Sequence, residues 1–144
     1  YGKLEEVSPA AFCSGLTDSP VYLGGQSATG LVILTRHAGM DGSQQLRPGI
    51  FSVPPQVALD ARMLSKKQAL DFRIHLGRTC WGPGELLSEV QEGMWRTVAA
   101  SAPLALKHCL MLPKPLWSEI LELCGGEASE LSAFARSSWS SASE

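Results

Sequence analysis

Apolar and polar positions alternate most regularly over residues 72–77. The apolar positions are Phe72, Ile74 and Leu76. Arg73 and His75 stand between them and should face the opposite way, because successive side chains of a β-strand point to opposite faces of the sheet. The segment therefore predicts a strand with one covered face.

Other short runs of apolar and β-branched residues also predict strands. They are residues 20–25, 31–35, 50–53 and 94–98. The second run is almost continuously apolar, which favours a strand buried on both faces. Residues 36–48 are rich in polar residues and contain the breakers Gly39, Asp41-Gly42 and Pro48, so they predict a loop.

Helical spacing of apolar residues recurs along the chain. It covers residues 57–70, 86–93, 103–112, 116–124 and 127–136. In the second segment, Pro83 fits the first helical turn and Gly93 stands where a left-handed C-terminal cap belongs. This helix would join strand 72–77 to strand 94–98. The serine-rich residues 137–144 predict a disordered tail.

The pattern thus predicts both short strands and helices along the chain. The chain has 144 residues, of which 44% are hydrophobic, enough for one domain with a sizeable core. We expect a single domain over residues 1–136, followed by the tail 137–144.

Charge and hydropathy exclude several classes of function. The chain has 12 Lys and Arg against 14 Asp and Glu, and only Lys66 and Lys67 are adjacent basic residues. Because binding to phosphates needs clustered positive charge, we expect no direct contact with nucleic acid. Apolar runs such as residues 31–34 are far shorter than the roughly 20 residues that span a bilayer. We expect no membrane insertion, although peripheral association stays open.

The start of the chain lacks the basic, apolar and small-residue regions of a secretory signal. This predicts a protein that is not secreted and that resides in the cytoplasm or in an organelle, the plastid stroma among them.

Several segments in a fixed order resemble the AlgH-like family, which comprises small bacterial and plant or algal proteins, mostly of unknown function. The segments are Pro20-Val21-Tyr22-Leu23-Gly24-Gly25, Leu31-Val32-Ile33-Leu34, Leu76-Gly77 with Trp81-Gly82-Pro83-Gly84-Glu85-Leu86, Trp95, and Leu116-Trp117-Ser118-Glu119-Ile120-Leu121. The resemblance runs from about Val21 to Phe134. It implies an α+β fold, the mixed β-sheet of short strands with packed helices of the AlgH-like fold.

The chain departs from the family pattern at three places. Arg78-Thr79 replaces Tyr-Ala, Cys80 stands where the family has glycine, and Gln26-Ser27 replaces Pro-Val. The opening section of the family is absent, so the chain resembles the later three quarters of the fold. We expect that another segment or a partner chain supplies the missing strand, or that the fold rearranges without it.

Two glycine-containing segments are candidate binding sites. Trp81, Gly82 and Gly84 precede a predicted helix, whose free N–H groups could hold an anion. Gly24 and Gly25 could let a ligand approach the backbone closely. The alternative for both segments is structural and is favoured here, because glycines commonly serve tight turns.

Cys80 and His75 flank the end of the predicted strand and could form a nucleophile–base pair. The family pattern has glycine at the position of Cys80, which favours a structural role for this thiol. His108 and Cys109 are adjacent, which is poor geometry for binding one metal ion. We predict neither a metal site nor a cofactor.

Trp139 lies among serines that cannot bury it, and exposed tryptophans often anchor interfaces, so we consider it a candidate partner contact. The favoured function is a non-enzymatic binding or scaffolding module that contacts other protein chains. The alternatives are an accessory subunit of a larger organellar complex, for example a plastid photosynthetic complex, and a small cysteine-dependent enzyme.

Overall fold

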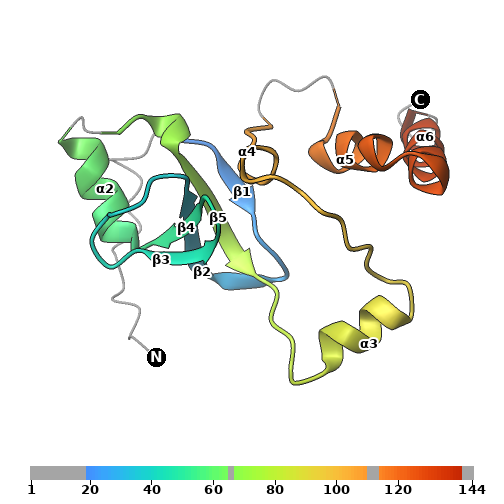
Figure 1. Ribbon diagram of the computed structural model, residues 1–144, viewed down its shortest axis with the longest axis horizontal. Coiled ribbons are helices and arrows are strands. Elements are labelled where there is room, and N and C mark those ends of the chain that lie inside the picture. Colours follow the sequence, from blue (N-terminus) through green and yellow to red (C-terminus); the bar gives the residue numbers. More distant parts are fainter. Residues whose placement is uncertain (1–18, 65–66, 110–113, 141–144) are drawn as a thin grey trace. The chain divides into compact units, whose positions relative to one another are not determined.

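The computed structural model of this chain describes residues 19–64, 67–109 and 114–140 (Figure 1). Contacts within the chain group it into two compact units, residues 1–108 and residues 109–144. Each unit is described by itself below. The single domain predicted over residues 1–136 stays a prediction.

A five-stranded sheet forms the first unit. Its strands are β1 (Val21–Leu23), β2 (Ser27–Thr35), β3 (Gln44–Arg47), β4 (Ile50–Val53) and β5 (Phe72–Arg78). They lie in the order β1-β5-β2-β4-β3. β1 pairs with β5 in parallel and the other pairs are antiparallel, so the sheet is mixed. The predicted α+β fold class is confirmed.

The hydrophobic core follows one row of residues across the sheet. Ile33 of β2 lies opposite Ile74 of β5 on one side and Val53 of β4 on the other. These side chains and Phe72 are almost fully buried. The helix α2 (Pro55–Met63) covers this face with its buried residues Ala58 and Leu59. Of the apolar residues predicted to share one face of β5, Phe72 and Ile74 are buried, whereas Leu76 is 45% exposed.

The helix α2 is shorter than the sequence predicts. A proline in its first turn starts it, and the N–H of Ala58 donates to the Pro54 carbonyl oxygen at 3.1 Å. The prediction extended the helix to Leu70, which instead lies in the short 3₁₀-helix η1 (Ala69–Asp71). The Asp71 carboxylate accepts the backbone N–H of Gln68 at 2.8 Å and so stabilises a new helical start. Residues 65–66 are outside the described part.

Two predicted features of the sheet are wrong. The strand β3 lies inside the predicted loop 36–48, where Gly49, at φ 76°, turns the chain so that Arg47 pairs with Ile50. Conversely, residues 94–98 form no strand. Both edges of β5 are already taken by β1 and β2, so a strand that follows β5 finds no free edge beside it.

Two short helices follow the sheet, α3 (Glu85–Gln91) and α4 (Ala102–Ala105). Gly93 has φ 79°, which confirms the left-handed conformation predicted after the first of them. The Ser101 hydroxyl accepts the N–H of Leu104 and caps α4. This helix ends well before the predicted boundary at residue 112, which lies in the undescribed range 110–113.

The second unit contains α5 (Leu116–Cys124), whose bounds match the prediction, and α6 (Gly126–Ser140). The buried hydroxyls of Ser118 and Ser132 share a 2.6 Å hydrogen bond between the two helices. α6 reaches Ser140 and so includes residues 137–140, and the disorder expected for the tail 137–144 stays a prediction. Ser137 and Ser138 donate their hydroxyls to the Phe134 carbonyl oxygen, which supports this last turn. Residues 141–144 lie outside the description.

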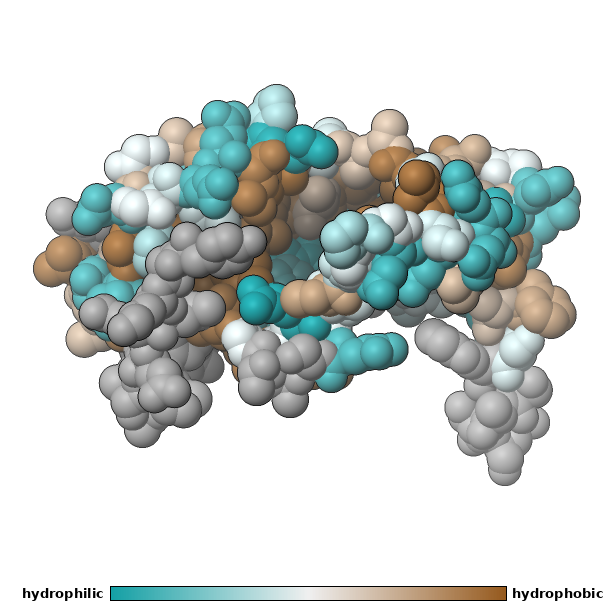
Figure 2. Space-filling model, turned by 90° about the horizontal axis from the view of Figure 1, so that it is seen from below, coloured by the Kyte–Doolittle hydropathy of each residue, from teal (hydrophilic) through white to brown (hydrophobic). Residues whose placement is uncertain are grey.

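Hydrophobic residues reach the surface among hydrophilic ones on the face shown in Figure 2. No helix in the described part of the chain is both long enough and apolar enough to cross a membrane.

Candidate functional site

Two tryptophans converge on one carboxylate after β5. The indole N–H groups of Trp81 and Trp95 both donate to Oε2 of Glu89 in α3, the first at 2.8 Å. The two rings meet edge to face, with centroids 5.7 Å apart. Glu89 therefore fixes the orientation of both indoles and ties residue 95 back to the loop before α3.

The start of α3 already holds an anionic group of this chain. Gly84, at φ 84°, precedes the helix, and the N–H of Gly82 donates to Oε2 of Glu85 at 2.6 Å. The Glu85 carboxylate thus takes the position that an external anion would need at Gly82. Ligand binding by Trp81, Gly82 and Gly84 stays a prediction, and the contacts give each residue a structural role.

Gly24 and Gly25 lie against the backbone of β5 and the residues after it. A Cβ atom on Gly24 would stand 2.2 Å from the Gly77 carbonyl oxygen, and one on Gly25 would stand 2.3 Å from the Thr79 nitrogen. The N–H of Gly24 also donates to the Leu76 carbonyl oxygen at 2.8 Å. Close backbone approach within the chain accounts for both glycines, and their role in ligand binding stays a prediction.

Several exposed apolar side chains of the first unit lie in α3 and in the residues that follow it. We define the α3 surface as Leu86, Leu87, Met94, Trp95 and Val98, each between 42% and 62% exposed. The N–H of Met94 donates to the Glu89 carbonyl oxygen at 2.9 Å, which caps the end of α3 and holds Met94 beside its last turn.

The charges around the α3 surface are mostly acidic. Between Thr79 and Val98 the sequence contains the carboxylates Glu85, Glu89 and Glu92 and one basic residue, Arg96. The surface is therefore apolar with an acidic frame.

A small cysteine-dependent enzyme would require a contact between Cys80 and His75, and the described residues do not show one. His75 faces Tyr22, with ring centroids 5.7 Å apart, and its pKa is lowered by burial and by the nearby charge of Arg73. Cys80 is exposed. Among the described residues no hydrogen bond joins His75 to Cys80, and no three His, Cys, Asp or Glu side chains are grouped to hold a metal ion.

A polar cluster on the face of the sheet opposite the core was not predicted. The Arg73 guanidinium lies 4.4 Å from the centre of the Tyr22 ring, and it donates to the carbonyl oxygens of Ala105 and Lys107. Tyr22 Oη and His108 Nδ1 are 3.2 Å apart. These contacts fasten residues 105–108 across β1 and β5.

The hydrogen bonds of His108 define its tautomer. Its Nε2 lies 2.9 Å from the Leu70 carbonyl oxygen, which can only accept, so Nε2 carries the proton. In the neutral ring Nδ1 then accepts the hydroxyl proton of Tyr22. The alternation in β5 placed Arg73 on the face opposite the apolar residues, so the sequence indicated its position. His108 is far from Tyr22 in the chain, and no sequence pattern indicated their contact.

Asp71 joins the end of β2 to the start of β5. Its carboxylate lies 2.9 Å from Nε2 of His37 and 3.7 Å from the Arg36 guanidinium, and its carbonyl oxygen accepts the Thr35 hydroxyl at 2.8 Å. Burial raises the pKa of Asp71. The hydrogen bonds from His37 and the Gln68 backbone, together with the charges of His37 and Arg36, outweigh burial and hold that pKa below its ordinary value of 3.8.

We expect Asp71→Asn to destabilise the fold in a pH-dependent way. The pKa of Asp71 is lower in the folded chain than in the unfolded chain, so ionised Asp71 stabilises the fold above pH 3.8 and loses this contribution as the pH falls through the folded pKa. Urea unfolding at several pH values should therefore show the largest difference between native chain and variant near neutrality. A difference that grows below pH 3.8 would contradict the assignment. Asp41→Asn, which removes an exposed loop carboxylate, is the control variant.

Comparison with known proteins gives one family and several bacterial relatives. The sequence pattern of the AlgH-like family matches residues 3–129. A UPF0301 protein of Chlorobium luteolum is 28% identical over 113 residues, covering 76% of this chain and 58% of the relative. One of Albidiferax ferrireducens is 26% identical over 121 residues, covering 71% and 61%.

A third UPF0301 protein, from a Polaromonas species, is 27% identical over 95 residues and covers 59% of this chain and 47% of the relative. This chain thus spans between about half and three fifths of the length of the curated relatives it matches. No solved structure matches significantly. Trp139 lies within α6, and its role as a partner contact stays a prediction.

Proposed function

This chain belongs to the AlgH-like family, and we propose that it acts as a non-enzymatic module that binds another protein chain. The observation that carries the proposal is the α3 surface, whose five large apolar side chains are all exposed within residues 86–98. Large exposed apolar patches on a protein mark interaction sites.

The contacts of the α3 surface support a role in binding. Trp95 is about half exposed while its indole N–H is held by Glu89, so its ring is oriented before a partner arrives. Preorganised aromatic side chains lose little conformational entropy on binding and are enriched among residues that dominate binding energy. Full burial of one leucine side chain contributes about 1.5–3 kcal/mol, so Leu86 and Leu87 are the expected aliphatic anchors.

The acidic frame defines the chemistry of the partner. Glu85, Glu89 and Glu92 give the surroundings of the α3 surface a negative potential. A partner with an apolar centre and a rim of lysine or arginine matches this surface in both hydropathy and charge. Its binding should weaken as salt concentration rises, because rim charges are screened.

We expect Leu87→Ser to weaken partner binding more than tenfold. Leu87 is 62% exposed, so the substitution removes apolar contact area while changing little within the fold. The partner would first be captured from a cell extract with the native chain. It would then be purified, and the Kd of each variant measured by calorimetry.

Leu23→Ser is the matched control for this measurement, since Leu23 is 90% exposed and lies in β1 rather than on the α3 surface. It should bind as the native chain does. Equal Kd values for Leu87→Ser and the native chain would reject the α3 surface as the binding site.

A second form of the proposal makes the chain an accessory subunit of a larger assembly, in the cytoplasm or in an organelle such as a plastid. The same exposed α3 surface favours it, because a subunit would bury such residues permanently. The mass of the native particle separates the two forms: a permanent subunit elutes only with its assembly, whereas a transient binder also elutes alone. Fractionation of the source cells tests the compartment.

A further inference from the structure

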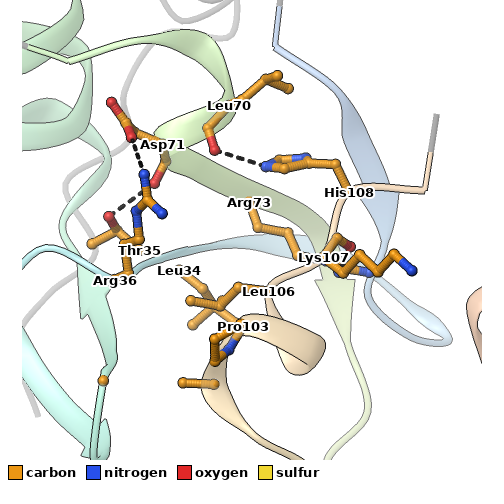
Figure 3. Close-up of a pocket in the computed structure, with 12 residues that line it drawn as sticks. Leu34, Thr35, Arg36, Leu70, Asp71, Arg73, Pro103, Leu106, Lys107 and His108 are labelled. Carbon is orange, nitrogen blue, oxygen red and sulfur yellow. Dashed lines mark hydrogen bonds and ion pairs between the residues drawn. The ribbon is translucent and has the colours of Figure 1, made fainter. Parts of the chain in front are cut away.

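A pocket of about 410 Å³ lies on the first unit, between the end of β2, the start of β5 and α4 (Figure 3). Its volume is within the range of small-molecule sites, about 300–1,000 Å³. All of its lining residues belong to residues 34–108, and none belongs to the α3 surface. The pocket is therefore independent of the protein-binding proposal.

One part of the pocket lining is apolar. Leu34 comes from β2, and Pro103 and Leu106 come from α4 and the residue after it. Figure 3 shows these three side chains close together below the charged residues. This part of the wall can bury the hydrocarbon portion of a ligand.

The lining also carries three cations, the guanidinium groups of Arg36 and Arg73 and the ammonium group of Lys107. Arg36 is at the mouth, with its side chain 74% exposed and its guanidinium 3.7 Å from Asp71, a separation longer than a hydrogen bond. Arg73 is held more deeply by the contacts with Tyr22 and the backbone of residues 105–107. The exposed guanidinium of Arg36 at the mouth has room to turn toward a ligand, while Arg73 supplies a fixed positive charge.

Asp71 limits the charge of the ligand. Its carboxylate is ionised and is already bound by His37 and the Gln68 backbone, so it repels a second negative group in the pocket. A ligand with one negative charge is attracted by the three cations of the lining and repelled by one carboxylate.

We propose that this pocket binds a small organic carboxylate. The carboxylate accepts N–H groups of Arg36 in a forked pair, which matches guanidinium geometry, and the apolar body of the ligand lies against Leu34, Pro103 and Leu106. This binding site is a property of the sheet and α4, separate from the surface proposed to bind protein.

Benzoate is the probe for this site, and benzyl alcohol is its uncharged counterpart. Each is titrated into the ¹⁵N-labelled full chain, and backbone amide shifts are followed by NMR. We expect benzoate to shift amides of residues 34–36, 70–73 and 102–108, and to bind more tightly than benzyl alcohol. No shift in these ranges at millimolar benzoate, or equal affinity for the alcohol, would overturn the proposal.

Arg36→Gln should weaken benzoate binding about tenfold, the usual effect of losing a charged hydrogen bond. Because Arg36 is largely exposed, the variant should fold as the native chain does, and its amide spectrum checks this. Arg78→Gln, which removes an exposed arginine from the other end of β5, should bind benzoate normally. If both variants bind equally well, Arg36 is not the anion contact and the proposal fails.

Discussion

Replacing Phe72 with alanine is expected to lower the free energy of unfolding of the first unit by about 3–5 kcal/mol. Phe72 is 0% exposed and packs in the cluster formed by β2, β4, β5 and α2. The substitution removes the largest fully buried side chain and leaves a cavity that the two layers cannot close without moving. Urea unfolding, followed through the backbone amide signals of β2 and β5, measures the loss.

The control for Phe72→Ala is Leu23→Ala, which also truncates a strand residue. Leu23 is 90% exposed, so its truncation should change the free energy of unfolding by no more than about 0.5 kcal/mol. Similar losses for both variants would mean that the buried face of the sheet is not the main source of stability.

The alternation in residues 72–77 predicted β5 well because the strand meets two different environments. Ile74 lies among buried side chains under α2, whereas Arg73 lies on the face covered by residues 105–108. Because successive side chains alternate between these two faces, apolar and polar residues alternate in the sequence. Leu76 is exposed although it continues the alternation, because the buried core ends before it. Where the core ends depends on the neighbouring elements and cannot be predicted from the alternation alone.

The strand β3 could not be predicted from hydropathy for the converse reason. All four residues, Gln44–Arg47, are exposed, so neither face of this edge strand selects for apolar side chains. Its backbone pairs only with β4, and the turn at Gly49 sets the pairing. Residues 94–98 show the opposite error: β-branched and aromatic residues favour a strand locally, but the neighbouring edges of β5 are taken.

The candidate sites too were predictable from the sequence only in part. The loop with Trp81 was recognisable because tryptophan and glycines are uncommon together, although its indole bond to Glu89 required the fold. The contact between Tyr22 and His108 joins residues 86 positions apart. No spacing rule connects two such residues, since their proximity depends on how residues 105–108 cross the sheet.

Replacing Gly24 with alanine is expected to destabilise the first unit by about 2–3 kcal/mol, whereas Gly82→Ala should cost less than about 1 kcal/mol. The reason lies in what each new methyl group meets. At Gly24 the Cβ atom would stand 2.2 Å from the Gly77 carbonyl oxygen, a backbone atom, so β1 must move away from β5. At Gly82 the nearest atoms belong to the Glu85 side chain, 3.2–3.3 Å away, which can rotate aside.

This pair of variants separates the structural role of the glycines from a role in ligand binding. If Gly24 serves only to let β1 approach β5, its substitution lowers stability and breaks the hydrogen bond from its N–H to the Leu76 carbonyl oxygen, which amide hydrogen exchange would detect. A Gly24→Ala chain with native stability and native exchange at residue 24 would contradict the close packing of β1 on β5. It would favour ligand contact as the reason for glycine at residue 24, because close packing within the chain would then not exclude a side chain there.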